Sequence, residues 1–192
     1  MSLRRLIIGM SGASGAVYGI ELLKALKAAG VETHLVVSRT AQITLAHETD
    51  YSLPQVHKLA DHFYSPNDLS ASIASGSFKT DGMIIAPCSV KSLAETATGN
   101  CGNLLARAAD VVLKERRRLV LMVRETPLHS IHLRNMLTLS DMGAIIVPPV
   151  PAFYTHPKSL DDMIRHTVGR VLDLFDIETD ALVKRWEGIP SN

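Results

Sequence analysis

Short apolar runs alternate with longer stretches of helical periodicity along the chain, and this alternation constrains the fold more than any other feature. The predicted strands are rich in Val, Ile and Leu without a polar–apolar alternation, and cover 3–8, 32–37, 82–86, 119–123 and 144–148. The predicted helices cover about 14–29, 39–48, 89–98, 103–116, 129–141 and 159–176. Such an order predicts an α/β fold, a Rossmann-like doubly wound parallel sheet with helices on both faces.

Length and composition favour a single domain of an ordinary globular class. The 192 residues are 46% hydrophobic and 20% charged, with a net charge of +1, so we expect neither nucleic acid nor a membrane as partner. We expect one domain over 1–192, with a tail from about 177, and a less regular region over 50–80 with a short helix and a loop. No apolar run reaches the roughly 18 residues of a membrane span, and no secretory signal is visible. We therefore expect a cytoplasmic location.

The segment GMSGASG, at 9–15, follows the first predicted strand and opens the first predicted helix. It lacks the Gly-Lys-Ser/Thr of a P-loop, the spacing of GxGxxG and the GxSxG of a nucleophile elbow. What remains is a glycine- and serine-rich helix N-terminus, which favours anion binding, with Ser11 and Ser14 as further hydroxyl donors. Ser38 and Thr40, after the second strand, are a second possible donor set. The alternative is a tight turn in which serine only caps the helix.

Two further segments place reactive side chains at the carboxyl ends of predicted strands. In APCSVKS, at 86–92, Cys88 could be a nucleophile, but a packing role is favoured because no histidine is near it in the sequence. In VRETP, at 123–127, Arg124 and Glu125 suit anion binding beside a proton shuttle, or else form a surface ion pair. Glu48, in HETD, lies near a helix C-terminus, where its charge opposes the helix dipole.

The sequence predicts no metal site. Cys88 and Cys101 form no CxxC or Cys/His cluster, and His129 and His132 have no carboxylate nearby in the sequence. The proline-rich segment PPVPAFY, at 148–154, presents Phe153 and Tyr154, which could stack on a flat ligand or cover the core.

Taken together, the motifs resemble the flavin prenyltransferases, the UbiX-like proteins formerly called aromatic acid decarboxylases. The matching segments run in order along nearly the whole chain: GMSGASG, VVSR, HETD, APCSVK, TGNCGNLLARAADVVLKERR, RETPLHSIHLRNM and VPPVPAFY. None of these motifs departs from the family pattern. The resemblance implies a Rossmann-like flavoprotein that binds FMN. It implies an enzyme that, without a metal, joins a dimethylallyl group from dimethylallyl phosphate to reduced FMN at N5 and C6. The prenylated FMN serves a UbiD-like decarboxylase of aromatic acids, and the prenyltransferase is a homo-oligomer, usually a dodecamer, with its site between subunits.

The resemblance also implies roles for individual residues. Those that match FMN contacts are Gly12, Ala13, Ser14, Ser38, Cys88, Ser89, Val90, Lys91 and Arg124. Those that match ligands of the donor's phosphate are Arg107, Lys114, Arg124, Tyr154 and Arg170. Those that match groups assisting proton and phosphate movement are Ser14, Glu48 and Glu125.

Three other functions remain open. An FMN-dependent decarboxylase of cysteine-containing substrates would use a histidine near the first helix and an Asn-x-x-Met-Trp motif, and both are missing here. Direct decarboxylation of aromatic acids lacks an obvious carboxylate-activating group. A non-catalytic flavin carrier subunit is disfavoured because Glu48, Arg124, Glu125 and Tyr154 are all present.

Overall fold

The computed structural model of the chain describes residues 4–178, 182–186 and 188. The chain packs as two compact units, Met1–Pro149 and Val150–Asn192. The single domain expected from the sequence stays a prediction. Among the described residues, no helix is both long and apolar enough to cross a membrane.

The first unit is built on a parallel sheet. Its six strands among the described residues are β1 (Arg5–Met10), β2 (Glu32–Val37), β3 (His62–Tyr64), β4 (Gly82–Cys88), β5 (Arg118–Val123) and β6 (Ile145–Ile146). They lie in the order β3-β2-β1-β4-β5-β6, and every pair of neighbours is parallel. This is the doubly wound order, in which the chain reverses direction across the sheet between β1 and β4. The predicted fold class is confirmed.

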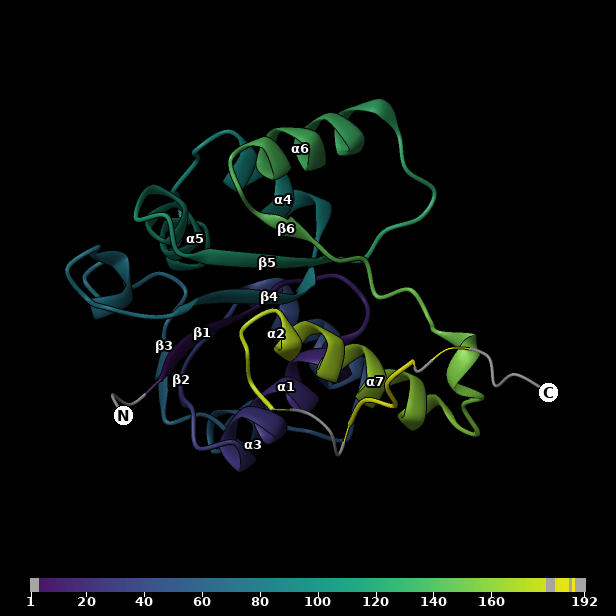
Figure 1. The fold of residues 1–192 in the computed structure, drawn as a ribbon. Helices are drawn as coiled ribbons and strands as arrows, with labels where there is room; N and C mark the ends of the chain where they lie inside the picture. The colour runs from purple at the N-terminus through teal and green to yellow at the C-terminus, as the bar shows by residue number, and fades with distance from the viewer. Residues whose placement is uncertain (1–3, 179–181, 187, 189–192) are drawn as a thin grey trace. The chain divides into compact units, whose positions relative to one another are not determined.

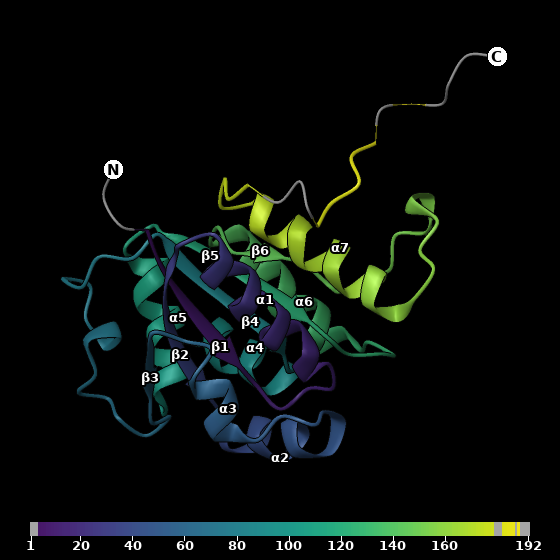
Figure 2. The same cartoon turned by 90° about the horizontal axis from the view of Figure 1, so that it is seen from below.

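Helices cover both faces of this sheet (Figures 1 and 2). Those of the first unit are α1 (Ala16–Ala28), α2 (Arg39–Glu48), α3 (Leu53–His57), α4 (Val90–Ala97), α5 (Leu104–Lys114) and α6 (Ser130–Asp141). The helix α2 contacts both α1 and α3, and α4 contacts both α5 and α6. Right-handed crossovers explain this grouping, because β1 and β4 wind toward opposite edges of the sheet. Apolar strands such as LVLMV are therefore buried on both sides, and Leu119, Val120 and Leu121 are fully buried.

The region 50–80 is where the structure adds most to the predicted elements. It contains α3, a 3₁₀ turn at Ser72–Ala74 and the short edge strand β3, which the sequence does not predict. β3 pairs with β2 over only three residues, His62 to Tyr64, so its pattern is too short to be distinguished from a loop. Elsewhere the predicted elements are present. The predicted bounds of β2 and α2 are confirmed at both ends, and no other end differs by more than three residues.

The second unit consists of a 3₁₀ turn, η2 (Phe153–Thr155), and the helix α7 (Leu160–Asp173). Ser159 caps α7 and forms a capping box with Asp162. The predicted helix over 159–176 is four residues longer than α7, and half of the predicted tail from 177 lies outside the described residues.

Candidate active site

A pocket of about 330 Å³ lies at the carboxyl edge of the sheet in the first unit. Its lining comes from the segments that follow β1, β2, β4 and β5, and consists of Gly12, Ala13, Ser14, Thr40, Ser89, Val90, Lys91, Arg124 and Glu125. These segments flank the point between β1 and β4 where the strand order reverses. Open parallel sheets bind their ligands at this position.

Three helices of the first unit begin beside this pocket. Gly15 precedes α1, while the side chains of Ser38 and Ser89 cap α2 and α4 by accepting hydrogen bonds from Ala41 N and Ser92 N. The distances are 3.1 Å for Ser38 and 3.2 Å for Ser89. Each N-terminus presents backbone N–H groups and a partial positive charge. Together they favour an anionic group in the pocket.

The glycines of GMSGASG are required by the local geometry. A Cβ on Gly12 would lie 2.5 Å from the Cβ of Thr40, which belongs to the first turn of α2. Gly15 adopts φ of 106°, in the left-handed region that glycine tolerates best. The loop can therefore pass close to α2 and leave its backbone accessible to a ligand.

Glu48 forms contacts that the sequence does not indicate. Its Oε2 accepts hydrogen bonds from Gly15 N at 2.8 Å and from Ala16 N at 3.2 Å. The carboxylate at the unfavourable C-terminal end of α2 thus lies at the favourable N-terminal end of α1. Burial alone would raise the pKa of Glu48. Hydrogen bonds from the Ser14 side chain and the two amides, with the charge of Arg124, lower it overall. Glu48 is therefore ionised at neutral pH and accepts a hydrogen bond from Ser14.

Ser11 and Cys88 lie beneath the pocket and do not line it. The Ser11 hydroxyl donates to Pro87 O at 2.9 Å and accepts from Ser89 N at 2.7 Å, so it joins the two loops. It is buried, and the hydroxyl donor expected from the sequence is engaged within the protein. The Cys88 side chain is fully buried, and burial raises its pKa to about 12. A thiol of this kind is not a nucleophile at neutral pH.

Arg124 and Glu125 are both exposed at the rim of the pocket. Arg124 N donates to Cys88 O at 3.1 Å, which fixes the backbone where β5 ends. Glu125 Oε1 accepts from Thr126 N at 3.0 Å. Among the described residues no ion pair joins Arg124 to Glu125, so the surface ion pair is not what the structure contains.

The other predicted phosphate ligands do not line this pocket. Arg107 lies on α5, where its Nε donates to Ala74 O at 3.2 Å and its Nη1 pairs with Asp110 at 2.8 Å. Lys114 ends α5, four residues before β5 begins, and therefore lies toward the amino edge of the sheet. Tyr154 and Arg170 belong to the second unit.

Within that second unit, His166 links the predicted ligands Tyr154 and Arg170. The Tyr154 hydroxyl lies 3.3 Å from His166 Nε2. Burial lowers the pKa of His166, the charge of Arg170 lowers it further, and Asp173 opposes both. His166 and Arg170 are one helical turn apart on α7, so they share a face of that helix.

Comparison with known proteins shows the family to which the chain belongs. A sequence model of the family described as Flavoprotein matches residues 1–172. A probable UbiX-like flavin prenyltransferase of Bacillus subtilis is 60% identical over 96% of this chain and 90% of its own length. The flavin prenyltransferase UbiX of Thauera aromatica is 57% identical over 96% of this chain and 94% of its own length. The chain belongs to the UbiX-like flavin prenyltransferases.

Solved structures of UbiX-like proteins share the whole fold with this chain. AnUbiX (PadA1), solved in complex with FMN and dimethylallyl pyrophosphate, is 53% identical and superposes with a TM-score of 0.96 over 98% of this chain and 100% of its own. A dodecameric FMN-dependent UbiX-like decarboxylase from Escherichia coli O157:H7 is 54% identical, with a TM-score of 0.93 over 96% of this chain and 100% of its own. The resemblance inferred from the motifs is thus confirmed. A PPC decarboxylase mutant, 23% identical with a TM-score of 0.63 over 78% of this chain and 84% of its own, shares only the fold.

Proposed function

We propose that the chain joins a dimethylallyl group to reduced FMN at N5 and C6, with dimethylallyl phosphate as the donor. The observation that carries this proposal is the pocket. Eight of its nine described lining residues, all but Thr40, are those that the motifs assign to FMN or to proton transfer. The names of the relatives support the same reaction. The prenylated FMN would then pass to a UbiD-like decarboxylase of aromatic acids, a partner that rests on the family resemblance.

The donor groups at the carboxyl edge fit FMN. The phosphate requires N–H groups and positive partial charge, which the N-termini of α1, α2 and α4 supply. Gly12 permits close approach to the backbone, and the capping serines Ser38 and Ser89 keep the two loops in position. When bound and reduced, the flavin ring supplies the electron-rich atoms that attack the allyl carbon. The protein therefore needs no nucleophile of its own, which agrees with the buried, protonated thiol of Cys88.

The chain's own charges stabilise the leaving group. Breaking the C–O bond of an allyl phosphate produces a delocalised cation and a free phosphate, so fixed cations around the phosphate lower the barrier. Arg124 supplies one such cation at the rim of the pocket. Tyr154 and Arg170 match phosphate ligands of the family by their motifs alone, and within the second unit both interact with His166.

Arg107 and Lys114 would reach the phosphate from a neighbouring copy of the chain. Two observations support a homo-oligomer, which we expect to be a dodecamer. The pocket is at the small end of the range of about 300–1,000 Å³ for ligand sites, so a second copy would complete its walls. In addition, five large apolar side chains are exposed on or beside α6 among the described residues: Leu128, Ile131, Leu133, Leu137 and Met142.

Ser14, Glu48 and Glu125 would have separate roles in hydrogen bonding and proton transfer. Ionised Glu48 accepts a hydrogen bond from the Ser14 hydroxyl, so the lone pairs of the Ser14 oxygen remain available to accept a hydrogen bond from a ligand. Glu125 is exposed at the rim, where its carboxylate could take up the proton that the flavin ring loses and, once protonated, give a proton to the double bond of the prenyl group so that the second ring bond could form. Expulsion of water by both substrates would protect the allyl cation. No metal ion is part of this proposal, and a cytoplasmic location stays a prediction.

The deciding experiment is anaerobic. The purified protein is incubated with reduced FMN and dimethylallyl phosphate, and in parallel with the diphosphate, and the mass of the released flavin is measured. A flavin heavier by one five-carbon unit establishes the transfer and identifies the donor. Unmodified FMN with both donors would contradict the proposal. Cysteine-ended peptides and aromatic acids would then be tested, because decarboxylation of either would support the alternative functions.

A further inference from the structure

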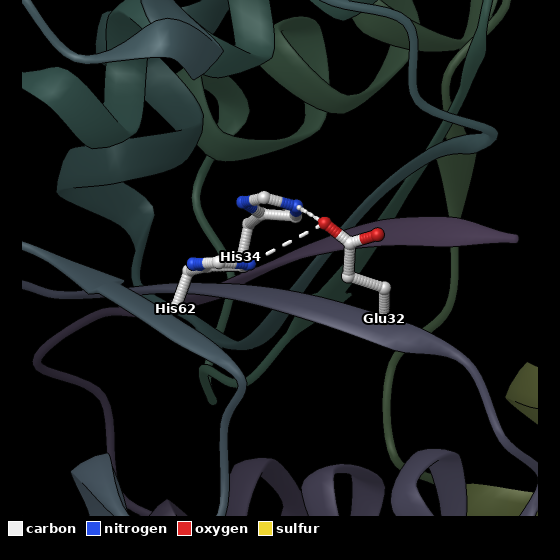
Figure 3. A group of neighbouring side chains, drawn as sticks. All are labelled: Glu32, His34 and His62. Carbon is white, nitrogen blue, oxygen red and sulfur yellow. Dashed lines mark hydrogen bonds and ion pairs between the residues drawn. The ribbon is translucent and has the colours of Figure 1, made fainter. Parts of the chain in front are cut away.

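A second cluster of reactive side chains lies at the opposite, amino edge of the sheet. Glu32 and His34 are on β2, and His62 begins β3 directly beside His34 in the parallel pairing. Residues two apart on a strand share one face of the sheet, so the three side chains meet on that face. Figure 3 shows both imidazole rings with a nitrogen turned toward the Glu32 carboxylate. All three ligand atoms lie within 4.8 Å of one another.

The spacing of these atoms suits a metal ion. Glu32 Oε1 lies 3.0 Å from His34 Nε2 and 3.4 Å from His62 Nε2. A tetrahedral Zn²⁺ with bonds of about 2.0–2.1 Å requires ligand atoms about 3.3–3.4 Å apart. Glu32 Oε1 is therefore already at about this distance from both histidine nitrogens. The two nitrogens, which lie within 4.8 Å of each other, must reach the same spacing for the three atoms to form one face of a tetrahedron. Imidazole and carboxylate are also the ligand types that zinc accepts.

The surroundings hold two of the three ligands in place. His34 is 2% exposed, and its Nδ1 lies 2.9 Å from the Tyr64 hydroxyl, which lies 3.1 Å from Ser72 Oγ. If Nδ1–H donates to Tyr64, the other nitrogen carries a lone pair toward the metal. Metal-binding histidines usually have an outer hydrogen bond of this kind. The second oxygen of Glu32 accepts from Arg5 Nε at 2.9 Å, which fixes the carboxylate.

Two features oppose a cation here, and each is offset. Arg5 brings a positive charge, but Asp81 accepts a hydrogen bond from Arg5 N at 2.7 Å and Asp61 interacts with His62, so two further carboxylates lie nearby. The rings of His34 and His62 are stacked, with centroids 4.7 Å apart, whereas a metal lies in the plane of each ligating ring. The His62 side chain is 53% exposed, so its ring can rotate into the required orientation.

We propose that Glu32, His34 and His62 bind one divalent transition-metal ion, Zn²⁺ above all, with water in the fourth position. The site lies at the sheet edge opposite the pocket, so its effect is on stability. It ties β3, an edge strand of three residues, to β2. The sequence does not indicate this site, because His62 lies 28 residues beyond His34 in a region without a clear pattern.

The test is a metal titration of the full chain, purified without a tag and treated with a chelator. Zn²⁺ binding is measured by calorimetry, and Co²⁺ is used as a spectroscopic probe of coordination. We expect one ion per chain, a four-coordinate Co²⁺ spectrum and a melting temperature that rises with the Zn²⁺ concentration. His62→Gln changes an exposed ligand without disturbing the core, and should weaken binding by more than the roughly 10- to 100-fold typical of outer-shell changes. Tyr64→Phe should weaken it by about tenfold.

A matched control is available in the second histidine pair. His129 and His132 also stack, with centroids 3.5 Å apart, and could bind a metal adventitiously. His132→Gln should therefore leave the affinity and the Co²⁺ spectrum unchanged. Equal affinities for the wild type and His62→Gln would overturn the proposal. Loss of binding in His132→Gln alone, or a dissociation constant weaker than about 0.1 mM, would overturn it as well.

Discussion

At the carboxyl edge of the sheet, Ser14, Lys91 and Glu125 line a pocket, whereas at the amino edge the Glu32 carboxylate is bonded to both Arg5 and His34. The helix directions explain part of this difference. In a parallel α/β unit each helix begins near the carboxyl edge and ends near the amino edge. Positive partial charge therefore gathers at the first edge and negative partial charge at the second. One edge favours an anion such as a phosphate, and the other favours a cation.

The largest expected effect at the carboxyl edge comes from Glu125→Gln. This change keeps the shape of an exposed side chain but removes its ability to take a proton, so turnover should fall about 100- to 10,000-fold. FMN affinity and melting temperature should not change, because the Glu125 side chain is exposed and its hydrogen bond from Thr126 N is one that a glutamine oxygen can also accept. Flavin mass after anaerobic incubation measures turnover, and fluorescence titration measures affinity.

The control for that variant is Glu21→Gln, the same substitution on α1 away from the pocket. Glu21 pairs with Lys24 at 2.6 Å and should be neutral for turnover. Normal turnover by Glu125→Gln would remove the assigned role of Glu125.

A smaller effect is expected where the loop approaches α2. The added methyl group in Gly12→Ala would lie 2.5 Å from Thr40 Cβ, so the loop must shift away from α2. Overpacking of this kind costs about 1–3 kcal/mol, which corresponds to a loss of FMN affinity of about 5- to 150-fold. Gly102→Ala is the matched control, because its nearest contact would be 3.4 Å away, at an Asn100 side chain. Equal FMN affinities for the two variants would place the flavin elsewhere.

Much of this carboxyl edge follows from the sequence, whereas the amino edge does not. The ends of the strands could be located from apolar runs such as LIIG and LVLMV. Because the strands are parallel, the residues that follow these runs meet at one edge of the sheet. Glu48 was located, but its partners were not, because the contact with Gly15 joins residues 33 apart. β3 was missed because three residues carry no periodicity. Without β3, the meeting of His34 and His62 has no sequence signal.

Two predicted ligands show a different limit of the sequence. Arg107 and Lys114 carry the right chemistry for a phosphate, but the fold of one chain directs α5 away from the pocket. The sequence shows which phosphate-binding side chains are present. It does not show whether one copy of the chain or two must supply them to the site.

A still smaller effect is expected from Glu48→Gln, and it depends on pH. The pKa of Glu48 in the folded chain lies below its ordinary value of 4.5, so ionised Glu48 stabilises the fold above about pH 4.5. This contribution disappears as the pH falls through the lowered pKa. The variant keeps an oxygen for the amides of Gly15 and Ala16 but loses the charge, at a cost of about 0.3–1 kcal/mol at pH 7. Urea unfolding of both proteins at pH 7 and pH 3.5 measures the difference in stability, which should be smaller at the lower pH. A difference that is the same at both pH values would assign the effect to the hydrogen bonds.

The smallest effect on turnover is expected from Cys88→Ala, a change at the carboxyl edge that removes no group facing the pocket. The thiol is fully buried and its pKa is raised to about 12, so it is protonated throughout the working range. Turnover should change by less than about threefold, equivalent to about 0.7 kcal/mol in the barrier. Stability should fall by about 1 kcal/mol, because a buried atom is lost from a packed core. Urea unfolding and the flavin mass assay separate the two quantities. A folded, FMN-binding variant without turnover would show that Cys88 takes part in the chemistry. Cys88 would then have to be assigned to the active site at this edge and not to the core beneath it.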